Sequence, residues 1–167
     1  MSENASMARL DTPSPLAVAA PFLRSAPVDL MGMAEALGLT VDMAAALSPD
    51  VSGRIVRGGA GSAGYHIDVN AMHSANRKRF TLAHEIAHYL LHRDLIGDGV
   101  EDNGLYRSRL SDAIEVEANK FAAQILMPSQ LVREVYRLVK SLPGLTAAFQ
   151  VSEDAMRIRL KELRLTP

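Results

Sequence analysis

Two stretches in the second half of the chain carry apolar residues at the spacing of an amphipathic helix. In residues 80–92 the apolar side chains recur every three or four positions, and the histidines occupy the opposite face. Residues 112–127 show a broader apolar arc and end before Pro128, which cannot continue a helix. The pattern predicts two helices here, with a long loop over residues 93–111 between them.

An alternating pattern further upstream predicts a small sheet. Tyr65, Ile67 and Val69 alternate with polar residues, which is typical of a half-buried strand. Residues 54–57 form a second strand-like stretch, and the glycine-rich segment 58–64 joins the two. We therefore expect an antiparallel hairpin.

Weaker patterns complete the order of elements. Helical spacing from Val28 to Val41 predicts a helix, with Gly38 near its end as a C-cap. Further helices are expected over residues 43–47, 131–142 (ended by Pro143-Gly144) and 145–163, the last span holding two. The order indicates the α+β class, with a small antiparallel sheet packed on a mainly helical domain.

The length of 167 residues fits one domain. Residues 1–26 mix small, polar and proline residues without a sustained period, so we expect a flexible tail there and a single domain over 27–167. No apolar run approaches the roughly 18–20 residues that span a bilayer. The short apolar stretch 16–23 contains Pro21 and follows acidic residues, which is untypical of a secretory signal. We therefore expect a cytoplasmic protein.

Composition narrows the chemistry. The net charge of -1 argues against a surface built as a whole for nucleic acid. The chain has no cysteine, which excludes disulfides, thiolate metal sites and cysteine nucleophiles. A transition metal would therefore be held by histidine, aspartate or glutamate, and five histidines are available.

The first predicted helix contains His84-Glu85-x-x-His88. Four-residue spacing places both imidazoles on one face, one turn apart, where they can reach a single metal ion. Glu85 points about 100° away from His84 and need not be a ligand, because successive residues of a helix turn by that angle. It could instead act as general base for the water that such a metal activates. The alternative is an amphipathic helix whose polar face is simply solvated.

A catalytic zinc site usually has three protein ligands, and the second predicted helix contains two candidates for the third, Glu115 and Glu117. Glu115 falls within the apolar arc, where an unpaired carboxylate is costly, so we predict it as the third ligand. Its alternative is an ion pair with an arginine. Glu117 falls on the polar face and is predicted to be an ordinary solvated charge. Asn119 could hydrogen-bond a ligand histidine, and His92 could contact substrate or a ligand.

Three linked motifs resemble the ImmA/IrrE family of metallopeptidases, which is zincin-like and similar to the gluzincins. They are the strand 67–70 leading into Arg79-Phe-Thr-Leu-Ala-His84-Glu85-Ile-Ala-His88, the segment 115–128 and the segment 149–160. The resemblance spans roughly residues 55–165.

The resemblance implies one zinc ion bound by His84, His88 and Glu115, with Glu85 as general base. It also implies a protein substrate, namely a helix-turn-helix repressor of the XRE type encoded nearby, whose cleavage regulates transcription. The ligand types would accept Mn²⁺ or Fe²⁺ as well as Zn²⁺.

Two parts of this hypothesis stay open. An oxyanion donor is needed, and His92, Tyr106 and Tyr89 are candidates. The strand 65–70 could pair with an extended substrate, or it could only hold the sheet together.

Two other functions compete with the peptidase. Residues 145–163 resemble a helix-turn-helix segment, in which Met156, Arg157, Arg159 and Lys161 could face DNA. However, related metallopeptidases carry the same segment, and no dense basic stripe supports base recognition, so we do not expect direct nucleic-acid binding. The other alternative is a non-catalytic partner-binding regulator, for instance half of a toxin–antitoxin pair.

Overall fold

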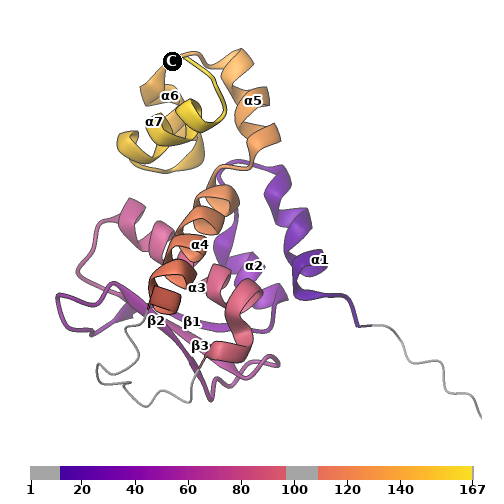
Figure 1. Cartoon of the computed structure of the whole chain (residues 1–167), viewed down its shortest axis with the longest axis vertical. Coiled ribbons are helices and arrows are strands. Elements are labelled where there is room, and N and C mark those ends of the chain that lie inside the picture. The colour runs from indigo at the N-terminus through magenta and orange to yellow at the C-terminus, as the bar shows by residue number, and fades with distance from the viewer. Residues whose placement is uncertain (1–11, 97–108, 167) are drawn as a thin grey trace, which may run out of the picture.

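The computed structural model describes residues 12–96 and 109–166. Its elements are α1 (Pro15–Ala19), η1 (Ala20–Arg24), α2 (Leu30–Ala36), β1 (Thr40–Ala45), β2 (Gly53–Arg57), β3 (Tyr65–Asn70), α3 (Ala75–His92), η2 (Arg93–Leu95), α4 (Arg109–Leu126), α5 (Ser129–Leu138), α6 (Leu142–Phe149) and α7 (Glu153–Glu162) (Figure 1). This architecture confirms the α+β prediction. None of the described helices combines the length and apolar character that crossing a membrane requires.

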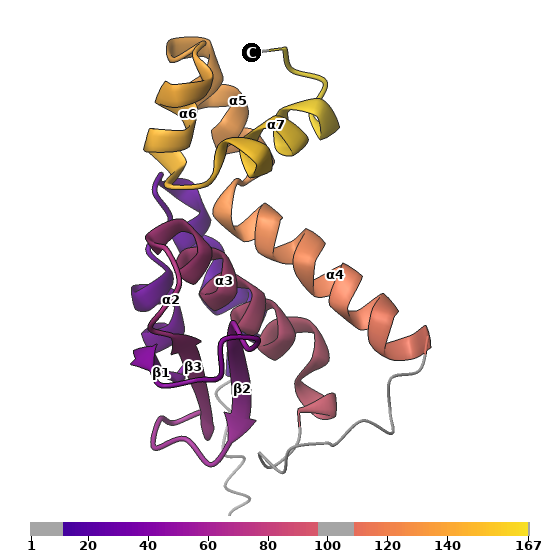
Figure 2. The same ribbon diagram turned by 90° about the vertical axis from the view of Figure 1, so that its left-hand side faces the viewer.

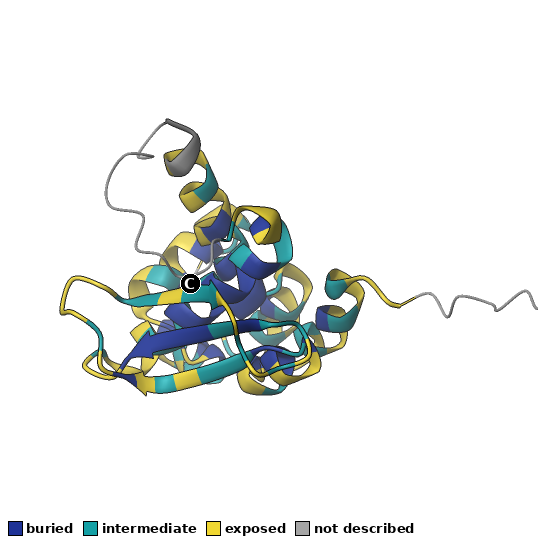
Figure 3. Ribbon diagram, turned by 90° about the horizontal axis from the view of Figure 1, so that it is seen from below, coloured by how far each residue is buried: buried dark blue, intermediate teal, exposed yellow. Residues whose placement is uncertain are grey.

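The sheet has three strands in the order β1-β3-β2. β2 and β3 form the predicted antiparallel hairpin, with Ile55 opposite Ile67. β1 adds a parallel strand on the other side of β3, with Val41 opposite Ile67, so the sheet is mixed rather than wholly antiparallel. β3 is therefore the central strand and is almost completely buried, not half-buried (Figure 3).

The helix predicted over 28–41 is wrong beyond Ala36, and the helix predicted over 43–47 is wrong throughout, because β1 runs to Ala45. The first helix ends at Ala36, Gly38 adopts the left-handed φ of 75° that a helix C-cap requires, and the chain then enters β1. Val41 fits the helical spacing of apolar residues that precedes it, but it lies in strand β1. Pairing with β3 is a contact between segments distant in sequence, and such pairing overrides local helix preference.

Helix α3 crosses the inner face of the sheet and lies between it and α4 (Figure 2). Its N-cap is Ser74, whose side chain accepts a hydrogen bond from the backbone N–H of Arg77, so the helix begins five residues before the predicted start. Leu82 and Ile86 are fully buried against Ile67 and Val69 of β3 in one core. Burial of this apolar face fixes the polar face of α3 toward α4.

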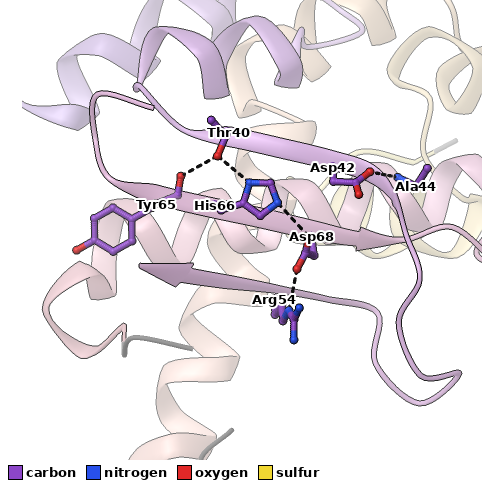
Figure 4. A network of polar contacts seen from close by, with 7 residues as sticks. All are labelled: Thr40, Asp42, Ala44, Arg54, Tyr65, His66 and Asp68. Carbon is purple, nitrogen blue, oxygen red and sulfur yellow. Dashed lines mark hydrogen bonds and ion pairs between the residues drawn. The ribbon is translucent and has the colours of Figure 1, made fainter. Parts of the chain in front are cut away.

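The face of the sheet away from α3 carries a chain of polar contacts across all three strands (Figure 4). The Thr40 hydroxyl lies 2.7 Å from Nδ1 of His66, and Nε2 of His66 lies 3.0 Å from Asp68. Arg54 donates from Nε to the other oxygen of Asp68 at 2.8 Å. These contacts join β1 and β2 to the central strand, and we assign them to the stability of the sheet.

The N-terminal prediction is wrong from Pro15 onward. Ser14 caps α1, Pro15 occupies its first turn, and Ala19 is buried in the core. The prolines of this segment were expected to interrupt a helix. Pro15 instead lies in the first turn of one, where a backbone N–H has no partner within the helix and is not missed. Residues 1–11 lie outside the described part of the chain.

The C-terminal helices α5, α6 and α7 pack beyond the end of α4 (Figures 1 and 2). The two helices expected over 145–163 are confirmed, but Pro143-Gly144 does not end a helix. Ser141 is an N-cap and Pro143 lies in the first turn of α6. Arg159 of α7 is buried, and its Nε donates to the Met127 carbonyl at 3.0 Å, which ties this segment to the end of α4.

Candidate metal centre

Helices α3 and α4 bring the three predicted ligand residues together. The Nε2 atoms of His84 and His88 are 2.9 Å apart. The Glu115 carboxylate reaches over from α4, with Oε2 lying 3.2 Å from Nε2 of His84 and Oε1 lying 3.2 Å from Nε2 of His88. One ligand atom from each of the three residues lies within 4.8 Å of the others.

The hydrogen bond at Nδ1 of His84 indicates which of its two ring nitrogens is free to bind a metal ion. Nδ1 of His84 lies 3.0 Å from the amide oxygen of Asn119, which can only accept, so Nδ1 carries the proton. The neutral ring then directs a lone pair from Nε2 toward His88 and Glu115. Lone pairs and a carboxylate that converge repel one another unless a cation lies among them. Two imidazoles and a carboxylate fit a divalent transition metal ion.

The protonation of His88 agrees with a ligand role. Burial of the ring, reinforced by neighbouring His84, lowers the pKa of His88 to about 4. The imidazole is therefore neutral at pH 7, which is the form that binds metals.

Glu115 is not buried, contrary to the reasoning that selected it. Its side chain is 54% exposed, whereas Ala118 and Ala122 of the same helix are fully buried. The residue lies at the edge of the apolar arc, where α4 leaves the core and faces the two histidines. Its position on the helix was predicted, but its environment was not.

Glu85 occupies a different environment from Glu115. It is 7% exposed and lines a cavity of about 350 Å³ together with Ser52, Gly53, Arg77, Phe80, Thr81, His84 and Asn119. Burial, and secondarily the charge of Glu115, raises the pKa of Glu85 to about 8. A carboxyl beside the candidate ligands but not among them, with a pKa near neutrality, suits proton transfer.

A pH-dependent stability follows for the protein freed of metal by a chelator. The folded-state pKa of Glu85, about 8, exceeds the ordinary 4.5, so the folded protein keeps a proton that the unfolded chain releases. The free energy of unfolding therefore falls as pH rises between these two values. Glu85→Gln removes this loss, and we expect its melting temperature to exceed wild type by about 5 °C at pH 8 and to match it near pH 4. Calorimetry across this range checks the prediction, and a difference that does not vary with pH would contradict it.

Gly53 allows the edge strand β2 to lie against α3 beside Glu85. A Cβ at this position would overlap the Thr81 methyl group, and it would lie 2.8 Å from the Asp68 carbonyl oxygen and 3.5 Å from Oε1 of Glu85. Gly53 was not among the predicted site residues. A glycine at the start of a strand is a known signal of close approach and could have marked it.

Gly53→Ala is expected to lower the free energy of unfolding by about 1–3 kcal/mol, because the new methyl group has no space. Urea unfolding measures the change. Thr81→Ser removes the methyl group that the substitution would meet, so the double variant should recover part of the lost stability. If the two effects simply add, the overlap is not the cause.

The remaining predicted site residues are placed as follows. His92 is buried, with Nδ1 3.1 Å from Nδ1 of His88 and Nε2 3.1 Å from Glu117, which the sequence analysis had taken for a solvated charge. Tyr89 is buried and packs edge-on against the Tyr65 ring of the sheet, so it does not belong to the ligand cluster. Tyr106 lies outside the described residues.

Comparison with known proteins agrees with this geometry. The model of the IrrE N-terminal-like domain family matches residues 34–161, a range that includes Gly53, Glu85 and all three candidate ligand residues. The radiation response metalloprotease IrrE of Deinococcus deserti is 38% identical over 82 residues, which are 47% of this chain and 28% of that protein. The alignment thus spans less than a third of this relative's length. Because the family model covers most of the chain, the protein belongs to the IrrE N-terminal-like domain family of metallopeptidases.

Proposed function

We propose that this protein is a zinc-dependent endopeptidase in which His84, His88 and Glu115 hold the metal. The observation that carries the proposal is the convergence of these three ligand atoms beside Glu85, a buried carboxyl that is not one of them. Structural zinc sites use four protein ligands, whereas catalytic sites use three and leave one position for water or substrate. The cluster among the described residues has three members.

The chain's own residues supply the proton transfers. A zinc ion would polarise the scissile carbonyl and lower the pKa of water. Glu85 accepts a proton from the attacking water and returns it to the leaving nitrogen. Asn119 holds the His84 ring in the ligating orientation through its amide oxygen. Tyr106 remains a candidate for oxyanion stabilisation, whereas both ring nitrogens of His92 already lie 3.1 Å from other side chains.

Among the described strands β2 pairs only with β3, so its outer edge is the place that we assign to an extended substrate. The strand 65–70 cannot take this role, because it pairs on both sides. Asn70 donates to the Ser52 carbonyl and Gly58 to the Gly64 carbonyl, so even-numbered residues of β2 bond to β3. The backbone groups of the alternate residues, Gly53, Ile55 and Arg57, therefore point outward. A peptide added there as a strand would pass Glu85 at its Gly53 end.

We further propose that the substrate is a helix-turn-helix repressor of the XRE type in the cytoplasm, encoded near the gene for this protein. Family resemblance supports this choice of substrate. The test mixes the zinc-loaded protein with that purified repressor, with and without a chelator, and identifies products by mass spectrometry. Zinc-dependent cleavage at one bond is expected. If the repressor stays intact while a random peptide library is cut, the substrate is wrong and the peptidase stands. If neither is cut, the non-catalytic regulator is favoured.

The DNA-binding alternative gains no support from the C-terminal helices. Met156 and Arg159, two of the residues considered for DNA contact, are buried. Arg159 is also paired with Glu162 at 2.9 Å, and Arg157 lies 3.5 Å from Glu153. Arg159 thus contributes to the packing of the segment, whereas Arg157 and Lys161 are exposed.

A further inference from the structure

We propose that His92 and Glu117 are positioning residues that hold the proton of His88 on Nδ1 and so direct its Nε2 atom to the metal. The inference rests on the proposed metal site, but it concerns how that site is oriented and not whether the protein cuts peptides. Neither residue belongs to the ligand cluster.

The direction of the hydrogen bonds between His88, His92 and Glu117 can be worked out starting from the Glu117 carboxylate. Glu117 can only accept, so Nε2 of His92, 3.1 Å away, carries a proton. The other nitrogen of a neutral His92, Nδ1, then has a lone pair. It lies 3.1 Å from Nδ1 of His88, within hydrogen-bond distance, and can accept the proton of that nitrogen. His88 is therefore the donor, and its Nε2 is left free to bind a cation.

Exposure along the relay supports a positioning role. The His92 side chain is only 8% exposed, so its ring has little room to turn, while Glu117 is 64% exposed and stays hydrated. The buried imidazole thus carries the influence of a surface carboxylate to a ligand that Glu117 does not itself contact. The negative charge at the end of the relay makes the His88 nitrogen a stronger electron donor.

The two ligand histidines are oriented by different devices. His84 donates directly to an uncharged amide, Asn119, whereas His88 donates through His92 to a charged group. The structure therefore predicts unequal consequences when the carboxylate is neutralised: Glu117→Gln should affect His88 and leave His84 unchanged.

The test measures zinc affinity by competition with a chromophoric chelator, using the full chain. His92→Phe keeps an aromatic ring but removes both nitrogens, and it is expected to weaken zinc binding about 10–100-fold. Glu117→Gln should weaken it less, by roughly tenfold. Glu134→Gln is the matched control, because this exposed carboxylate lies on α5, where it accepts a hydrogen bond from Gln130, and the substitution should change nothing.

A second readout separates positioning from general damage to the fold. Long-range nitrogen NMR of the histidine rings in the zinc-loaded protein should show the His88 proton on Nδ1, with its shift moved by Glu117→Gln and the His84 shift unmoved. His92→Gln, which restores an acceptor, should recover part of the affinity that His92→Phe loses. Zinc affinities within twofold of wild type for both His92→Phe and Glu117→Gln would overturn the relay, as would a His88 proton found on Nε2. Tight zinc binding without cleavage would contradict the peptidase and leave the relay intact, whereas absence of zinc binding would remove both.

Discussion

Glu85→Gln is expected to abolish peptide cleavage while zinc stays bound with wild-type affinity. Glutamine has nearly the same shape but cannot take a proton from water, and general acid–base catalysis typically contributes 10²–10⁴-fold. Because Glu85 is buried and is not one of the three proposed ligand residues, the metal position should be unaffected. Product formation from the repressor, or from the peptide library if the repressor is not a substrate, is measured beside metal content.

The control for this substitution is Glu134→Gln, which neutralises a carboxylate far along the chain on α5. It should cut at the wild-type rate. A Glu85→Gln variant that also cut at the wild-type rate would remove the assigned base, and a variant that lost its zinc would show that Glu85 acts on the metal instead.

Glu115→Ala is expected to lower zinc affinity by more than roughly 100-fold, because it leaves only two protein ligands. Loss of a residue that merely hydrogen-bonds a ligand typically lowers metal affinity by roughly 10–100-fold. Cleavage should fall with zinc occupancy. Since the Glu115 side chain is 54% exposed, the metal-free variant should keep its stability within about 0.5 kcal/mol of wild type. Chelator competition and urea unfolding of metal-free protein separate these two effects.

The neighbouring exposed residue on α4 provides the comparison. Val116→Ala changes a side chain that is also half exposed and should leave zinc affinity unchanged. Equal affinities for the Glu115→Ala variant and wild type would mean that the carboxylate does not bind the metal, whatever its distance from the two histidines.

Local patterns were informative where the side chain and its partner lie within one element. The helical spacing that places His84 and His88 one turn apart is a property of a single helix, and α3 keeps it. The hairpin of β2 and β3 joins neighbouring segments, and its alternation was readable for the same reason. The tail prediction was wrong from Pro15 onward because Ser14-Pro15 can begin a helix as well as interrupt one.

Contacts between distant segments account for the remaining differences. β1 forms because it pairs with β3, although its own residues show helical spacing. Glu117 was taken for a solvated charge because its partner, His92, lies on another helix. The wheel of α4 predicted Glu115 correctly as a neighbour of the histidines but wrongly as buried, since exposure depends on where α4 leaves the sheet and α3 behind.

The sequence by itself determined the chemical groups of the candidate centre and the turn-by-turn spacing of two of them, because helix geometry is local. Only the tertiary structure decided that Glu115 meets both histidines and that Gly53 lets β2 approach Glu85. It also decided that, among the described strands, β3 pairs on both sides and β2 on one side only. The physical reason is that these relations arise from packing α3 between the sheet and α4. That packing is driven by apolar burial, which sets the distances between groups that no local pattern connects.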